Sequence, residues 1–266
     1  SGAKLHDITI LDAPSVGLEV SASLDMSVDH LTVRGAWNKG EGGNGYGLEI
    51  GETFNSSFTN LDIIDTRHAV LFSGWDSEAN NTIHIANTNR DVNFHGGPET
   101  GNVITVDRAV LSYNPAEDTS GGRGYLPIVG DHVTTHANID PYAGNVVRFG
   151  YAVASDAADT FYGLDGGAYL NGRGGMDTIF GGAGDDVIVG GLNKDVMTGG
   201  AGADTYLVRV GDNYDRIMDF DIAAGDRFQS GNHAQQGRLA AARRPKQNDK
   251  GAVRDLQVDA VHDFKI

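Results

Sequence analysis

The sequence has no cysteine, little proline and no long hydrophobic run. Without cysteine the chain can form no disulfide, no thiolate nucleophile and no Cys-ligated metal site. No apolar stretch approaches the ~18 residues of a membrane span, so no membrane-spanning segment is predicted. Basic residues are scarce as well, since 20 Lys and Arg face 36 Asp and Glu, for a net charge of −16. This balance argues against a nucleic-acid partner and suits a solvated or cation-recruiting protein.

Glycine, in contrast, is abundant, with 38 residues against 6 prolines. Glycine with so little proline indicates ordered tight turns rather than a disordered linker. The chain begins without a methionine or a hydrophobic leader, and a strand-like pattern starts already at His6. We interpret it as a fragment or a processed chain whose architecture continues upstream.

Residues 6–106 repeat short apolar strands with a period near 22 residues. Two series of strands alternate, rich in Val, Ile, Thr and Phe, with Gly, Asn, Asp and Ser at the corners. Helical periodicity does not persist, which argues against a helical solenoid. A parallel β-helix is predicted instead, with neighbouring coils in register. The aligned residues are Ile10, Val33, Ile63, Ile85 and Val106 in one series, and Leu18, Leu48, Val70 and Val92 in the other.

From Ala154 to Leu207 the chain divides into six consecutive nonapeptides on the template G-G-x-G-x-D-x-U-x. The eighth position is apolar in all six, and the sixth is Asp in five and Ala168 in the other. The glycine-rich turn exposes carbonyl oxygens, and the Asp adds an anionic oxygen. Ca²⁺ takes about six to eight oxygen ligands, more than one turn supplies, so the ion must bridge stacked turns.

The sixth-position aspartates are the predicted calcium ligands. Because two nonapeptides form one coil of 18 residues, aspartates 18 positions apart stack along one edge. A weaker site is expected at Ala168, which carries no carboxylate. The predicted ligands are Asp159, Asp177, Asp186, Asp195 and Asp204, with sites between Asp159 and Asp177, Asp177 and Asp195, and Asp186 and Asp204.

This stretch resembles the hemolysin-type (repeats-in-toxin) calcium-binding module of bacterial proteins exported by type I secretion. The resemblance covers residues 154–228, because 210–228 is similar to the segment that closes such modules. It implies an extracellular location, the type I secretion apparatus as a partner, and folding triggered by external Ca²⁺. The predicted fold is all-β, a right-handed parallel β-helix followed by a calcium-binding parallel β-roll. The predicted domains are the β-helix with an irregular cap at 1–150, the roll at 151–228 and a basic tail at 229–266.

Outward-facing polar residues of adjacent coils are the candidates for catalysis, because alternate residues of a strand point to the same face. Asp62 is predicted directly beside His84, and Asp91, Asn93 and His95 are predicted to form one polar row. Such residues are also typical of a solvated surface, where an ion pair contributes under ~1 kcal/mol. The candidate catalytic residues are the bases His84 and His95, the carboxylate-neutralising Arg67 and Arg90, and the orienting or acid groups Asp62 and Asp91. The candidate substrate-binding residues are Trp37, Tyr46, Glu49 and Asn93.

A β-helix followed by hemolysin-type repeats is similar to the mannuronan C-5 epimerases and related exopolysaccharide lyases. The resemblance implies a secreted enzyme that removes the C-5 proton of a uronate in an extracellular acidic polysaccharide, with His or Tyr as the base. The Asp-Pro-His stretch of the epimerases is absent, and the nearest string is Asp140-Pro-Tyr142. Two alternatives stay open. One is a glycoside hydrolase with Glu19 and Glu49, or Glu49 and Asp91, as its carboxylates, and the other is a non-catalytic calcium-stabilised adhesin or matrix protein.

Overall fold

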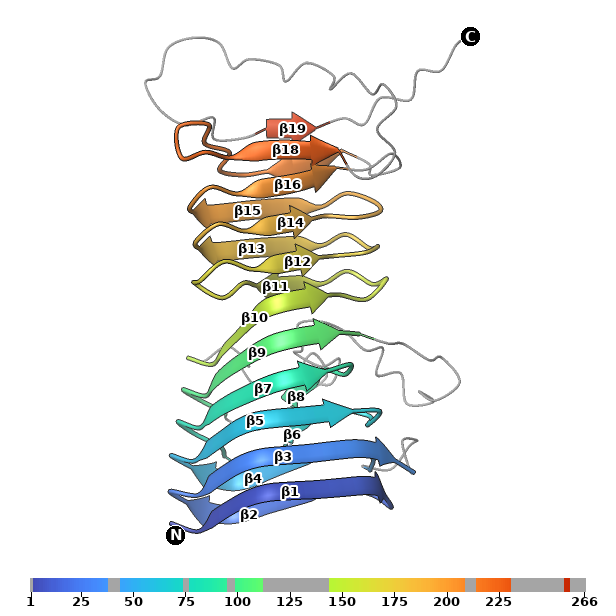
Figure 1. Cartoon of the computed structure of the whole chain (residues 1–266), viewed down its shortest axis with the longest axis vertical. Helices are drawn as coiled ribbons and strands as arrows, with labels where there is room; N and C mark the ends of the chain where they lie inside the picture. The colour runs from blue at the N-terminus through green and yellow to red at the C-terminus, as the bar shows by residue number, and fades with distance from the viewer. Residues whose placement is uncertain are drawn as a thin grey trace. The chain divides into compact units, whose positions relative to one another are not determined.

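The computed structural model describes residues 2–37, 44–73, 77–94, 99–111, 144–208, 214–230 and 256–258. All regular elements in these residues are β-strands, which stack coil upon coil as a parallel β-solenoid (Figure 1). The all-β prediction is therefore confirmed. In the same part of the chain there is no apolar helix long enough to cross a membrane. The chain forms two compact units, Ser1–Arg148 and Phe149–Ile266.

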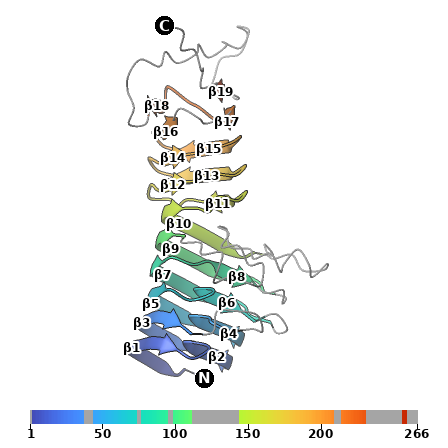
Figure 2. The same ribbon diagram turned by 90° about the vertical axis from the view of Figure 1, so that its right-hand side faces the viewer.

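The described residues of the first unit contain two parallel sheets, and the first four coils each contribute one strand to both of them (Figure 2). The strands of the longer sheet are, in spatial order, β1 (Lys4–Ala13), β3 (Ser27–Ala36), β5 (Ser57–Ile64), β7 (Thr82–Thr88) and β9 (Val103–Val110). The strands of the shorter sheet are β2 (Leu18–Leu24), β4 (Leu48–Phe54), β6 (Val70–Phe72) and β8 (Val92–Phe94).

Alternate residues of these strands form the core of the first unit. Leu31 and Leu61 lie inside with no exposed surface, as do Leu48 and Val70 from the shorter sheet. In the shorter sheet Leu18 pairs with Leu48, Leu48 with Val70, and Val70 with Val92. The predicted alignment of this series is therefore confirmed, because a fixed strand spacing keeps apolar residues over one another.

The longer sheet departs from the predicted alignment between β5 and β7. Leu61 pairs with Ile85, and Ile63 pairs with Thr88 rather than with Ile85. The two strands are offset by 25 residues from their first pair, Ser57 with Thr82, rather than by the predicted 22. An extra residue on β5 at Asn60, whose φ of 57° is left-handed, changes this offset by only one residue, and a second shift after Leu61 restores it. Asp62 consequently faces Asn87, and the prediction that Asp62 lies directly beside His84 is wrong.

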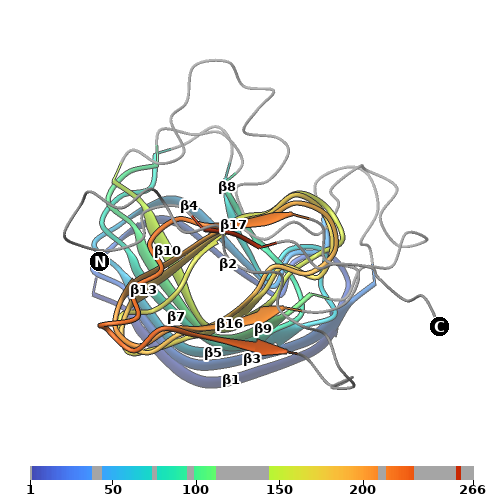
Figure 3. The ribbon, with the colours of Figure 1, turned by 90° about the horizontal axis from the view of Figure 1, so that it is seen from above.

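The second unit, which begins at Phe149 within β10, repeats a shorter coil. The strands of one sheet are β10 (Val146–Val153), β12 (Tyr169–Asn171), β14 (Val187–Val189), β16 (Thr205–Val208) and β18 (Arg227–Ser230). The strands of the other are β11 (Thr160–Tyr162), β13 (Thr178–Ala183), β15 (Val196–Ala201), β17 (Asp215–Ile217) and β19 (Leu256–Val258). Figure 3 shows the corners of these coils lying over one another. All described strand pairs here are parallel except β17 with β19.

The register of the second unit follows the nonapeptides. Thr160 pairs with Thr178, and Tyr169 pairs with Val187, in each case 18 positions along the chain. Two nonapeptides therefore make one coil, as predicted. The apolar eighth positions all lie in the core, at most 1% exposed, and they are Phe161, Leu170, Ile179, Ile188, Met197 and Tyr206.

Candidate functional site

The sixth-position aspartates form two ladders that tie neighbouring coils of the second unit together. The backbone N–H of Asp159 donates to Asp177 Oδ1 at 2.8 Å, and that of Asp177 donates to Asp195 Oδ1 at 2.8 Å. Along the other edge the N–H of Asp186 donates to Asp204 Oδ1 at 3.0 Å. All five predicted ligands are about 1% exposed. Oδ1 of each of these later aspartates thus accepts a backbone hydrogen bond from the preceding coil.

The second carboxylate oxygen lies against the glycine that opens the nonapeptide. A Cβ on Gly172 would overlap Asp177 Oδ2, and a Cβ on Gly181 would overlap Asp186 Oδ2. Both Oδ2 atoms are buried without a hydrogen-bond partner among the described residues. A buried anionic oxygen that faces a bare backbone corner needs a positive partner, because leaving a charge unpaired is costly. This donor set fits a hard cation.

The electrostatics of the ladders agree with that requirement. Burial, opposed by the N–H of Asp159 and reinforced by the charges of neighbouring aspartates, raises the pKa of Asp177 to about 8. Burial likewise raises the pKa of Asp186 to about 6 and shifts the pKa of Asp204 upward. The described residues contain no group of three or more His, Asp or Glu side chains arranged for a metal. Backbone carbonyls of the glycine corners must therefore complete a coordination shell, as Ca²⁺ accepts.

Residues 171–206 match the RTX calcium-binding nonapeptide repeat, in four copies. The RTX repeats bind Ca²⁺, and four of the predicted ligands, Asp177, Asp186, Asp195 and Asp204, lie within the matched residues. Proteins that carry RTX repeats are typically secreted. No curated protein matches the chain, and no solved structure matches it either.

The aspartate ladders continue beyond the RTX match. The N–H of Asp195 donates to Asp215 Oδ1 at 3.0 Å, and the N–H of Asp204 donates to Asp226 Oδ1 at 2.9 Å. Sequence reasoning missed both residues because longer turns precede them. The signal was nevertheless present, since each is followed by Arg and then by a buried or half-buried apolar residue, in the order of the RTX strand.

A second polar group lies in the first unit, where the chain enters the strands of the shorter sheet. His68 Nδ1 lies 2.8 Å from Asp91 Oδ1, and both residues are buried. The ring of Tyr46 stacks on that of His68 with 5.6 Å between centroids and 24° between planes. The guanidinium carbon of Arg67 lies 5.9 Å from the centroid of the Tyr46 ring. These four residues are called the corner cluster below.

Backbone register assembles the corner cluster from three successive coils. The N–H of Gly47 donates to the carbonyl of His68 at 2.9 Å, and the N–H of Ala69 donates to that of Asp91 at 2.7 Å. These bonds stack the residues before β4, β6 and β8 over one another. Side chains from sequence positions more than 20 apart consequently meet at one corner.

The cluster has a marked electrostatic character. Burial raises the pKa of Tyr46, an effect that Arg67 opposes and Glu49 reinforces. Burial also raises the pKa of Glu49, and Glu19, its register partner on β2, raises it further. When His68 Nδ1 carries its proton and donates to Asp91, the lone pair of Nε2 remains as a base. The arrangement therefore combines a base, its orienting carboxylate, a phenol and a guanidinium.

The structure thus brings together Tyr46, Arg67 and Asp91 from the predicted residues and adds His68. Sequence reasoning overlooked His68, although it lies two residues before Val70, at the same offset as Tyr46 before Leu48. Asp91 and Asn93 are buried rather than exposed as a row. Asn93 Oδ1 has no hydrogen-bond partner among the described residues.

The other predicted site residues lie away from the corner cluster or outside the described residues. Arg90 is also buried, at 8% exposure, one residue before Asp91, whereas Trp37 is 80% exposed after the end of β3. Asp62, on β5, forms an ion pair with Arg34 and accepts a hydrogen bond from Asn87 at 3.1 Å. His95 lies outside the described residues.

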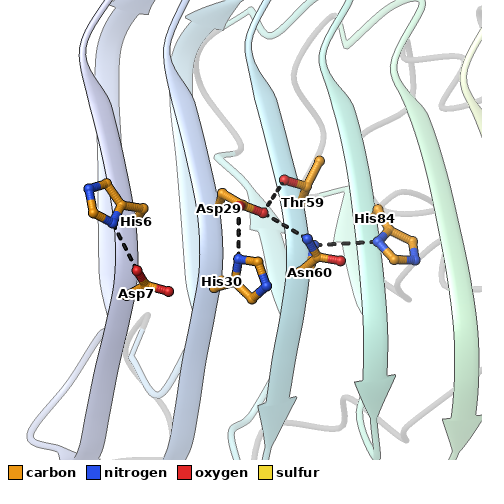
Figure 4. Close-up of polar contacts among 7 residues, drawn as sticks. All are labelled: His6, Asp7, Asp29, His30, Thr59, Asn60 and His84. Carbon is orange, nitrogen blue, oxygen red and sulfur yellow. Dashed lines mark hydrogen bonds and ion pairs between the residues drawn. The ribbon is translucent and has the colours of Figure 1, made fainter.

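His84 belongs to a polar row on the longer sheet (Figure 4). Its Nε2 lies 2.9 Å from Asp107 Oδ2, and its Nδ1 accepts the N–H of Asn60 at 3.4 Å. Asp29 in the same row accepts hydrogen bonds from Thr59 and Asn60, which lower the pKa of Asp29 to about 2. These groups are at least partly exposed and bonded to one another, as is typical of a solvated sheet face.

Proposed function

We propose that the chain is a secreted, calcium-stabilised protein that acts on an extracellular acidic polysaccharide by removing the C-5 proton of a uronate. The corner cluster carries this proposal, because a buried His–Asp pair beside a tyrosine and an arginine has the parts that the reaction needs. In this proposal residues 1–150 form the catalytic β-helix, 151–228 the calcium-binding roll and 229–266 a basic tail. Export through the type I secretion apparatus belongs to the same proposal.

Each member of the corner cluster has one role in the proposed reaction. Arg67, together with Arg90, which directly precedes Asp91 in the sequence, neutralises the carboxylate of the uronate, which makes the C-5 proton more acidic. His68 Nε2 accepts that proton, while Asp91 holds the imidazole in the required tautomer and stabilises its protonated form. Tyr46 lies against His68 and supplies a phenolic proton. Calcium, held in the other unit, supplies stability and takes no part in these steps.

Two outcomes follow from the same first step. In a lyase the electron pair left at C-5 forms the C4–C5 double bond, the C4–O4 bond breaks, and Tyr46 gives its proton to O4. In an epimerase C4–O4 stays intact, and C-5 regains a proton on the opposite face. Both outcomes conserve the atoms of the substrate apart from the exchanged protons, and neither needs an oxidant.

The product made from a uronate polymer tests the proposal. The full chain, saturated with Ca²⁺, is incubated with alginate, polygalacturonate and an acidic bacterial exopolysaccharide. Absorbance of an unsaturated uronate supports a lyase, and incorporation of solvent deuterium at C-5 without cleavage supports an epimerase. The variant His68→Ala is expected to lose at least about 100-fold in rate. The matched control is His84→Ala, which removes a histidine also bonded to an aspartate and is expected to retain full activity.

A glycoside hydrolase is the second candidate, favoured by the register pairing of Glu19 with Glu49. Burial and the neighbouring Glu19 carboxylate both raise the pKa of Glu49, which suits a general acid beside an ionised partner. New reducing ends without unsaturation, abolished by Glu49→Gln and unaffected by His68→Ala, would establish this candidate in place of the first. Inertness toward all three polymers, with binding retained, would overturn both enzymes and favour an adhesin.

A further inference from the structure

One nonapeptide of the second unit departs from the RTX template at its ligand position. In residues 163–171 the sixth position is Ala168, which is buried and carries no carboxylate. The corner is nevertheless joined to the next coil like the others. The N–H of Ala168 donates to Asp186 Oδ1 at 2.6 Å, as the N–H of Asp186 does to Asp204 Oδ1 at 3.0 Å. The fold therefore keeps a turn in which the carboxylate of the template is missing.

The same nonapeptide has an aspartate, Asp165, at its third position. This carboxylate lies between two coils, because its Oδ1 is 3.3 Å from the Cβ position of Gly182 on the next coil. The two other atoms nearest to that position are also oxygens, the carbonyls of Gly163 at 3.2 Å and of Leu164 at 3.6 Å. Three oxygens, one of them anionic, thus border the space in front of Gly182. In the four later nonapeptides the third residue carries no carboxylate, and it is Gly174, Ala183, Leu192 or Ala201.

The space in front of Gly182 is more open than at the equivalent glycines. Gly191 and Gly200 are also the second residues of their nonapeptides. The Cβ position of Gly191 lies 2.3 Å from the carbonyl oxygen of Arg173, and that of Gly200 lies 1.9 Å from the carbonyl oxygen of Gly182. Backbone of the preceding coil therefore fills those two corners, whereas no atom comes within 3.2 Å of the Cβ position of Gly182. The more open corner is the one that Asp165 borders.

We propose that Asp165 is a calcium ligand that replaces the missing sixth-position carboxylate beside Ala168. Carbonyl oxygens carry no net charge, and the number of charged ligands sets how tightly an oxygen site holds Ca²⁺. Asp165 supplies that charge from the third position, with the carbonyls of Gly163 and Leu164 as neighbouring donors. Asp165 is exposed, so its carboxylate adjusts to an ion without disturbing the core. The corner of Ala168 therefore holds a calcium ion that its sixth position alone does not predict.

The number of Ca²⁺ ions bound by the full chain tests the proposal. Ala168→Asp restores the carboxylate of the template, and because Asp165 already completes the site, we expect equilibrium dialysis to give the unchanged number of ions. Asp165→Asn is expected to bind one ion fewer. The double variant Asp165→Asn/Ala168→Asp is expected to regain that ion, which shows that the single variant lost a ligand and not its fold. An additional ion in Ala168→Asp would overturn the proposal even if Asp165→Asn folds poorly, and so would an unchanged ion count in a folded Asp165→Asn.

Asp156→Asn is the matched control. Asp156 is the exposed third-position aspartate of the preceding nonapeptide, which keeps its sixth-position ligand Asp159. Its Oδ1 lies 3.6 Å from the Cβ position of Gly174, and the three atoms nearest to that position include no carbonyl oxygen. We therefore expect Asp156→Asn to bind the full number of ions. Loss of one ion from both variants would show that any acidic residue near the corners has this effect, and it would overturn the specific role of Asp165.

Discussion

At the scale of single residues, the glycine that opens each RTX turn leaves no room for a side chain. A Cβ at Gly172 would overlap both Asp177 Oδ2 and the carbonyl oxygen of Gly190. We expect Gly172→Ala to displace this ligand, to weaken Ca²⁺ binding and to lower the free energy of unfolding by ~1–3 kcal/mol. Calcium titration and thermal denaturation measure the two effects.

The matched control for that substitution is Gly166→Ala. A Cβ at Gly166 meets no atom within 4 Å, and the residue lies in the same kind of turn. We expect Gly166→Ala to leave calcium binding and stability unchanged. Equal losses from the two variants would show that glycine acts through backbone freedom and not through contact with the carboxylate.

Tyr46 combines a packing surface with a reactive hydroxyl. Phenylalanine at this position keeps the ring that stacks on His68 and removes only the oxygen. Under the proposed function we expect Tyr46→Phe to lower the rate on a uronate polymer by about 100-fold or more while the melting temperature stays nearly constant. Initial rates and differential scanning calorimetry provide the readouts. Full activity in this variant would remove the hydroxyl from the chemistry.

At the scale of elements, a buried asparagine ladder joins the coils of the first unit. Asn81 accepts the N–H of Ser56 at 2.9 Å, and its amide nitrogen donates to the carbonyl of Thr53 at 2.8 Å. Asn102 repeats the pattern one coil later, accepting the N–H of Asn81 at 2.9 Å. The ladder therefore satisfies backbone groups at corners where no strand partner is available.

Removing one rung of this ladder leaves buried backbone groups unpaired. We expect Asn81→Ala to lower the free energy of unfolding by ~2–3 kcal/mol, because more than one hydrogen bond is lost inside the protein. Chemical denaturation of the Ca²⁺-saturated chain measures this loss. Asn87→Ala is the control, since Asn87 is half-buried and donates to Asp62, and its loss should cost under about 0.5 kcal/mol. Comparable losses would refute the ladder as a stabilising element.

At the scale of the whole molecule, the two units differ in their dependence on Ca²⁺. The second unit buries aspartates whose charge needs a cation, whereas the first unit has an apolar core and hydrogen-bonded corners. We expect EGTA to unfold residues 154–228 and to leave the coils of the first unit mostly intact. Circular dichroism should therefore lose part of its β signal, and limited proteolysis should retain a fragment from the first unit. A spectrum that does not respond to EGTA would contradict calcium-dependent folding.

The sequence alone determined the parts of this protein that depend on local repetition. The nonapeptides place an apolar residue and a carboxylate at constant spacing, so the 18-residue coil, the buried eighth positions and the identity of the ion all follow from the pattern. The alignment of β4, β6 and β8 also follows from the sequence, because the residues that pair across these strands keep the 22-residue spacing of the apolar pattern without a register shift.

Only the tertiary structure decided which polar residues meet. The 25-residue offset between β5 and β7 places Asp62 opposite Asn87 rather than His84, and the 22-residue spacing of the apolar residues Ile63 and Ile85 does not indicate this offset. The same holds for the contact of His68 with Asp91 and for the hydrogen bonds from Ser155 to Asp159. Apolar spacing constrains the inward side of a coil, where packing tolerates no shift. The polar side has no such constraint, so corner geometry and backbone register set its contacts.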